Sequence, residues 1–141
     1  MTMRTSAKRS RNMRAIRSQG GRSTELRFRA VLMRRRVRGW RMGPSEILGT
    51  PDFYFDRLRI AVFVDGCFWH CCPTCGHVPK TNLDYWTRKL SRNRKRDRLV
   101  TARLRRAGVH VLRYWECELY KRPQAAVDKL MTRIVRVRRL R

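Results

Sequence analysis

Hydrophobic and polar residues alternate in short stretches that predict a β-sheet. Residues 52–55 are an aspartate and three aromatic residues, residues 56–57 are polar and typical of a turn, and residues 58–64 place an apolar side chain at every second position. We expect two adjacent strands here. The second should be buried on at least one face, and on both because its intervening residues include alanine and phenylalanine. A third strand is expected from Val109 to Cys117.

The first predicted helix follows a pair of glycines. Ser23 or Thr24 is expected to cap it, which places Glu25 in its first turn. The apolar residues at helical spacing, which we expect it to bury, are Leu26, Ala30 and Met33.

Two more helices are expected in the second half of the chain. A strongly basic helical region runs from Asn82, as its cap, to a stop at Gly108, and Pro123 opens the last helix. The apolar stripe of this last helix is Ala126, Val127, Leu130 and Ile134. Strands interleaved with helices predict an α/β fold.

The composition indicates a nucleic-acid partner. The 141 residues include 36 lysines and arginines against 10 acidic residues, a net charge of +26, and these cations lie in three blocks along the chain. A polyanion is the expected ligand. A membrane surface is disfavoured, since the chain has no apolar run long enough to span one and no basic amphipathic helix of low core content. Without a secretory signal, a cytoplasmic location is expected.

Five cysteines in a cytoplasmic protein favour metal binding over disulfides. The motif Cys72-Pro73-Thr74-Cys75 is a Cys-x2-Cys knuckle, whose spacing lets two thiolates converge on one tetrahedral ion. Cys67 and Cys117 can supply the rest of a structural zinc site, although Cys71 and His77 are also within reach. Thiols that hold no metal are the alternative.

Several further motifs occur in a fixed order along most of the chain, from about Lys8 to Leu119. They are residues 11–16 (RNMRAI), Glu25, Pro51-Asp52-Phe53, residues 62–70, residues 79–86, Lys89 with Asn93, and Trp115-Glu116-Cys117. In these motifs the chain resembles the very short patch repair (Vsr) DNA mismatch endonucleases. The resemblance implies a restriction-endonuclease-like fold of the PD-(D/E)XK type, with a central mixed sheet flanked by helices and a structural zinc site.

The resemblance also implies an activity. Such an enzyme recognises thymine opposite guanine, the product of 5-methylcytosine deamination, and nicks the thymine strand 5′ of the mispaired thymine with magnesium. Asp52 and the backbone carbonyl of Val64 would bind magnesium, and Glu25 and His70 would hold or activate water. In-line cleavage of a phosphodiester needs these parts. Taken singly, Glu25 also suits a helix terminus, Asp52 a turn and His70 a zinc site.

DNA contacts follow from the same resemblance. Met13, Phe68 and Trp69 would insert into the base stack, which costs least at a mispaired step. Packing in the core is the plainer interpretation of the two aromatic residues. Lys89 and Asn93 lie four residues apart on the predicted helix, share a face, and are candidates for reading the mispair.

Position 65 departs from the family pattern. Where well-studied members have a histidine, this chain has Asp65, and where they have a zinc histidine it has Cys72. An aspartate binds magnesium directly or orients a water bound to it. We therefore expect Asp65 to be catalytic, as a second magnesium-site carboxylate, with His70 the remaining acid–base group. A turn aspartate before Gly66 is the alternative.

The expected organisation is a basic DNA-binding arm (1–21), an endonuclease domain with the zinc site (22–135) and a basic tail (136–141). The expected partner is double-stranded DNA with a mismatch, bound by a monomer in the bacterial cytoplasm at the nucleoid. The family implies a functional link to a cytosine-5 DNA methyltransferase and a repair polymerase. A nuclease of the same fold in restriction, phage defence or a mobile element, and a zinc DNA-binding protein without catalysis, are the alternatives.

Overall fold

The computed structural model describes residues 23–141. The predicted basic arm (1–21), with Met13, lies outside the described residues. In chain order the elements are a helix over residues 23–34, β1 (Arg41–Met42), β2 (Phe53–Phe55), β3 (Ile60–Asp65), α2 (Leu83–Arg106), β4 (His110–Trp115), α3 (Glu116–Lys121) and α4 (Pro123–Arg139). Among these elements, no helix is both long and apolar enough to cross a membrane.

The strands form a mixed sheet in the order β1-β2-β3-β4. β1, β2 and β3 are antiparallel neighbours, and β3 pairs in parallel with β4 from Ile60↔His110 to Asp65↔Trp115. The mixed sheet and the three predicted strands are confirmed. Parallel strands need a long crossover, which α2 and the segment before it provide.

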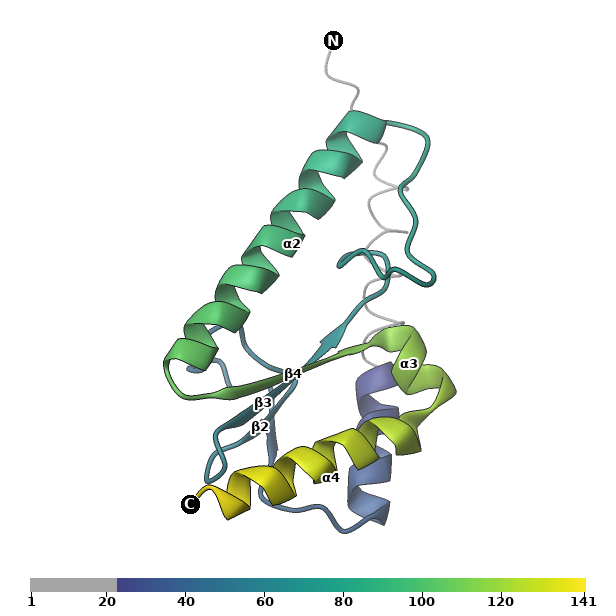
Figure 1. Cartoon of the computed structure of the whole chain (residues 1–141). Coiled ribbons are helices and arrows are strands. Elements are labelled where there is room, and N and C mark those ends of the chain that lie inside the picture. Colours follow the sequence, from purple (N-terminus) through teal and green to yellow (C-terminus); the bar gives the residue numbers. More distant parts are fainter. Residues whose placement is uncertain (1–22) are drawn as a thin grey trace.

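Helices cover both faces of this sheet, because apolar residues alternate along its strands. Ile60 and Val62 of β3 join the core beneath α4 and the helix over residues 23–34, whereas Ala61 and Phe63 join a smaller core that includes Leu104 of α2. Figure 1 shows α2 on one side of the sheet and α4 on the other, with α2 running on past the sheet beside the segment that follows β3.

The interpretation of the first helix was wrong in its cap and in its buried face. Ser23 and Thr24 are both helical, so neither is the cap. Leu26 and Met33 are 48% and 59% exposed, and Ala30 is exposed as well. The residues buried instead, also at helical spacing, are Thr24, Phe28, Val31 and Leu32.

The other differences concern the ends of elements. β4 ends at Trp115, so Cys117 lies in the unpredicted helix α3 rather than at a strand end. Asn82 is the residue before α2, as expected, but its side chain makes no capping hydrogen bond. α4 continues to Arg139 and buries Val137, so the expected boundary of the tail at residue 136 falls inside a helix.

Candidate active site and cysteine cluster

Three carboxyl groups meet at the end of the sheet where β3 finishes. Asp52 precedes β2, and one of its oxygens accepts a hydrogen bond of 2.5 Å from the Val64 backbone N–H. Burial raises the pKa of Asp52 to about 7, with the nearby carboxyl groups of Glu25 and Asp65 adding to the effect against the Val64 hydrogen bond. The structure thus brings together Glu25, Asp52 and Asp65, as the sequence predicts.

Asp65 is the last residue of β3 and is 7% exposed. Both of its carboxylate oxygens accept hydrogen bonds of 2.8 Å from Arg113 of β4, in a fork-to-fork arrangement. Arg113 lies opposite Phe63 in the register, and its guanidinium lies 4.5 Å from the centre of the Phe63 ring. The sequence did not point to Arg113, because its partner is 48 residues away.

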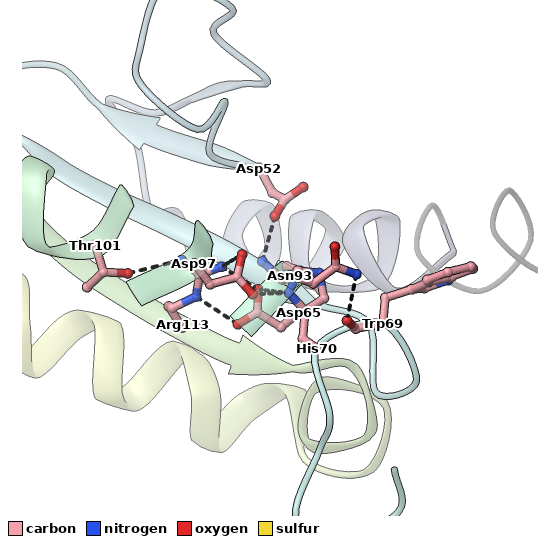
Figure 2. A network of polar contacts seen from close by, with 9 residues as sticks. Asp52, Asp65, Trp69, His70, Asn93, Asp97, Thr101 and Arg113 are labelled. Carbon is pink, nitrogen blue, oxygen red and sulfur yellow. Dashed lines mark hydrogen bonds and ion pairs between the residues drawn. The ribbon is translucent and has the colours of Figure 1, made fainter. Parts of the chain in front are cut away.

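His70 lies next to two acidic residues. Its Nδ1 contacts Asp97 Oδ2 and lies 3.8 Å from Asp65 Oδ1. Asp97 belongs to α2 and is also 3.3 Å from Arg113. Figure 2 shows Asp65, His70, Asp97 and Arg113 as one network, with Asp52 beside it. Asp97 was missed, although an acidic residue four positions after Asn93 in a basic helix was a usable signal.

One face of α2 carries polar residues at every fourth position, and each contacts this region. Lys89 Nζ lies 5.3 Å from the centre of the Trp69 ring. Asn93 donates a hydrogen bond of 3.1 Å to the Trp69 carbonyl, Asp97 contacts His70, and Thr101 accepts a hydrogen bond of 3.1 Å from Arg113. The expected shared face of Lys89 and Asn93 is therefore present.

The two adjacent aromatic residues pack at the outer end of this face. Phe68 and Trp69 are half-buried, with ring centres 5.0 Å apart. Both also contact Trp86 of α2, at 5.3 and 6.1 Å between ring centres. Trp86 lies in the motif of residues 79–86, but the sequence did not place it beside Phe68 and Trp69.

Four cysteines form a compact cluster beside the carboxyl groups. The sulfur atoms of Cys67, Cys72, Cys75 and Cys117 all lie within 4.8 Å of one another. Within the described part of the chain, this cluster includes neither Cys71 nor His77. The predicted set of four therefore assembles, from the segment after β3 and from α3, into an arrangement that can hold a metal ion.

The local backbone favours a thiolate at Cys72. Burial of Cys72 favours its neutral thiol, but hydrogen bonds from the backbone N–H groups of Cys75 and Thr74 and from the side chains of Cys117 and Cys75 together outweigh burial and lower its pKa to about 6. The turn is also tight, because a Cβ atom at Gly76 would lie 2.5 Å from the Cys72 carbonyl oxygen. A thiolate donor in a closely wrapped turn fits a structural metal site.

Three of the acidic residues, Asp52, Asp65 and Asp97, border a hollow of about 420 Å³. Asp52, Val64, Asp65, His70 and Arg113 all line it. A second hollow lies along the outer face of α4, lined mainly by apolar residues and arginines. The groups suited to hydrolysis therefore share the first hollow.

Comparison with known proteins identifies the family. The family model described as DNA mismatch endonuclease Vsr matches residues 1–75. The DNA mismatch endonuclease Vsr of Escherichia coli (strain K12) is 36% identical over 132 residues, which span 91% of this chain and 81% of that protein. The chain belongs to the Vsr family. The predicted family is confirmed, and with it the prediction of a DNA endonuclease.

Other relatives of this Vsr chain are named as nicking enzymes. Type II nicking enzyme V.NaeI of Lentzea aerocolonigenes is 43% identical over 128 residues, 86% of this chain and 75% of that protein. Type II nicking enzyme V.HpaIIP of Haemophilus parainfluenzae is 33% identical over 122 residues, 85% of this chain and 86% of that protein. The similarity to these relatives extends well beyond residue 75.

The crowded carboxyl groups lead to a prediction about stability. Folding raises the pKa of Asp52 from 3.8 to about 7, so the folded state disfavours the ionised carboxylate. The resulting loss of folding stability is absent below about pH 4, where Asp52 is protonated in both states, and complete above about pH 7. Asp52→Asn should therefore raise the free energy of unfolding by about 1–3 kcal/mol at pH 8, and by much less at pH 4. Urea unfolding of both proteins in EDTA at the two pH values measures this. Equal gains at both would contradict it.

Proposed function

We propose that this Vsr-family chain is a magnesium-dependent, strand-specific nicking endonuclease. It recognises T:G mismatches that arise from 5-methylcytosine deamination and cleaves 5′ of the mispaired thymine, which starts very short patch repair. The observation that carries the proposal is the meeting of Asp52, Asp65, Asp97 and His70 in one hollow, with Glu25 next to Asp52, in a chain with a net charge of +26.

A magnesium ion suits the crowded carboxyl groups. Desolvation and mutual repulsion hold Asp52 at a raised pKa, and a hard divalent cation that binds oxygen relieves both. We assign Asp52, Asp65 and the backbone carbonyl of Val64 to this ion, in a site of the PD-(D/E)XK type built on Pro51-Asp52 and Asp65. Bound magnesium supplies positive charge that offsets the charge developing on the phosphate.

The chain's own groups handle the water and its proton. Glu25 is close enough to Asp52 to affect its pKa, and from there it orients a water molecule. Asp97 holds Nδ1 of His70, so we assign Nε2 to face the water and to accept or donate a proton. Asp97 fixes the orientation of the imidazole ring, as carboxylates do for other functional histidines.

Recognition is assigned to the other end of α2. Phe68 and Trp69, backed by Trp86, present a rigid aromatic edge that can enter an unstacked base step. Lys89 and Asn93 lie beside it and are the proposed readers of the mispair. Met13, outside the described residues, remains the third proposed wedge residue. The high positive charge supplies affinity for the phosphate backbone.

The cysteine cluster is assigned to structural zinc. A set of four thiolates is the commonest closed, tetrahedral environment for zinc and leaves no open position for catalysis. Because Cys67 follows β3 and Cys117 lies in α3, zinc here fixes the segment that carries Phe68, Trp69 and His70 to the end of the sheet.

Strand mapping on defined duplexes tests the function. With magnesium, the protein should nick the thymine strand of a T:G duplex, and T:A and C:G duplexes at least about 100-fold more slowly, since intact steps resist unstacking. End-labelled strands resolved on a denaturing gel give the rates and the site. Equal rates on all duplexes would support the same-fold nuclease without T:G specificity, and binding without cleavage a zinc DNA-binding protein.

Metal analysis tests the cysteine cluster. Cys75→Ser removes one proposed ligand, so bound zinc, measured by mass spectrometry of the purified protein, should fall, and the free energy of unfolding should fall by about 2 kcal/mol or more. Cys71→Ser is the matched control, because Cys71 is outside the cluster. One zinc per chain in both variants would remove Cys75 from the ligand set.

Replacement of Asp65 tests its place in the magnesium site. Asp65→Asn should slow nicking by about 100-fold or more while mismatch binding stays intact, because the amide is a poor magnesium ligand. Asp128→Asn, on the outer face of α4, is the control for loss of one carboxylate. Single-turnover nicking and fluorescence anisotropy measure the two properties. Unimpaired nicking by Asp65→Asn would leave Asp65 with a turn role.

A further inference from the structure

Arg113 has no place in the chemistry assigned above, yet it contacts three side chains of the site. Its Nε and Nη2 donate to Asp65, Nη1 donates to Thr101, and Nη2 is 3.3 Å from Asp97. We propose that Arg113 is a positioning residue of the nuclease site: it fixes α2 to the catalytic strand β3 and thereby holds Asp97 against His70. This inference rests on the proposed function of that site.

The positions of the partners in the fold support this role. Asp65 ends β3, Arg113 lies in the neighbouring strand β4, and Asp97 and Thr101 lie one turn apart on α2. One guanidinium therefore joins two strands to the crossover helix at the point where the helix passes the hollow. A guanidinium is rigid and planar, so it fixes the angle between its partners as well as their distance.

Charge supports the same role. Asp65 and Asp97 both lie next to His70 and Arg113, and of these two partners Arg113 is the one with a permanent positive charge. Arg96 also lines the hollow, but its side chain is exposed and makes no described ion pair with either aspartate. Among the described residues, Arg113 is the cation that holds the two carboxylates together.

The geometry favours positioning over direct contact with DNA. A guanidinium has five N–H groups, and contacts to Asp65, Thr101 and Asp97 use most of them. Its side chain is 22% exposed and lies over the Phe63 ring. The fork also leaves Asp65 available to magnesium, because a carboxylate oxygen has a second lone pair beyond the one that Arg113 uses.

The two adjacent residues Trp69 and His70 give this role a consequence for the reaction. Asn93 holds the carbonyl of Trp69, and Asp97, one turn later on α2, holds the ring of His70. Loss of Arg113 releases the Asp97 carboxylate and would therefore misplace the ring of His70, while the contact of Asn93 with Trp69, one turn earlier on α2, and the positive charge of the helix remain. Loss of Arg113 should slow the chemical step and leave duplex affinity nearly unchanged.

The experiment compares Arg113→Met and Arg113→Lys with wild type, using the duplex that wild type nicks fastest. Single-turnover rates at saturating enzyme report the chemical step, and anisotropy in EDTA reports duplex affinity. We expect Arg113→Met to be about 10–100-fold slower, with affinity within about 3-fold. Arg113→Lys, which keeps the charge but not the fork, should recover part of the rate.

Two further arms separate positioning from other causes. Arg59→Met is the matched control: Arg59 binds the Ala107 carbonyl at the far end of α2, and this variant should nick at the wild-type rate. In the double variant Asp97→Asn/Arg113→Met, the nicking rate should be less than about 3-fold below that of Asp97→Asn alone, because both substitutions act through His70. Thermal unfolding sets a temperature at which every variant is folded. If Arg113→Met does not fold, Arg113→Lys carries the comparison.

The outcomes are distinct. Weaker duplex binding with an unchanged saturated rate would make Arg113 a DNA contact and overturn the proposal. An equal loss of nicking rate in Arg59→Met and Arg113→Met would overturn it as well. So would a double variant whose rate falls by the full product of the two single effects, because Arg113 and Asp97 would then act independently. Failure of the proposed T:G specificity would show in the wild type, as equal nicking of T:A and T:G duplexes, and the comparison of variants still stands on either duplex.

Discussion

The parallel pairing of β3 and β4 is the constraint from which the site follows. Because the two strands run in the same direction, Asp65 and Trp115 lie at the same edge of the sheet, and the chain must cross over between them. The residues that follow each strand therefore meet. Cys67, which follows β3, and Cys117, which follows β4, come together at this end of the sheet in this way. The crossover helix α2 passes the same end, which places Asp97 next to His70.

The electrostatic interactions at this end of the sheet oppose the stability of the fold. A chain with 36 cationic residues gathers several of its 10 acidic residues around one hollow. Glu25 lies close to Asp52 and helps to raise the pKa of its carboxyl group. Asp65 and Asp97 both form ion pairs with Arg113. Repulsion between buried carboxylates is retained at functional sites, where binding of a cation or a substrate relieves it.

Parts of this structure follow directly from the sequence. The aromatic run of β2 and the alternation in β3 predicted both strands, and the apolar residues on both sides of β3 predicted its burial, because a strand between two helical layers is apolar on both faces. The cysteine spacing pointed to the four cysteines that cluster in the fold, and the family motifs pointed to Glu25 and Asp52. These features depend on neighbours along the chain or on residue types with few other uses.

The remaining parts depend on packing between distant segments. The helix over residues 23–34 has apolar residues on two faces, and periodicity alone does not decide between Leu26 and Phe28 as the buried side. Asp97 resembles the many other charged residues of α2, and nothing near Arg113 in the sequence of β4 indicates its partners until the fold brings Asp65 and Asp97 to it. α3 is six residues long, too short for a helical period to separate it from the end of β4.

The polar face of α2 also constrains how the length of this protein can change in evolution. Lys89, Asn93, Asp97 and Thr101 keep contact with the site because they are four residues apart, and one inserted residue would rotate every later position by about 100°. These contacts therefore constrain the length of the segment between Trp86 and Thr101. Insertions and deletions in relatives should therefore fall in the connections that flank α2, where no helical register has to be kept.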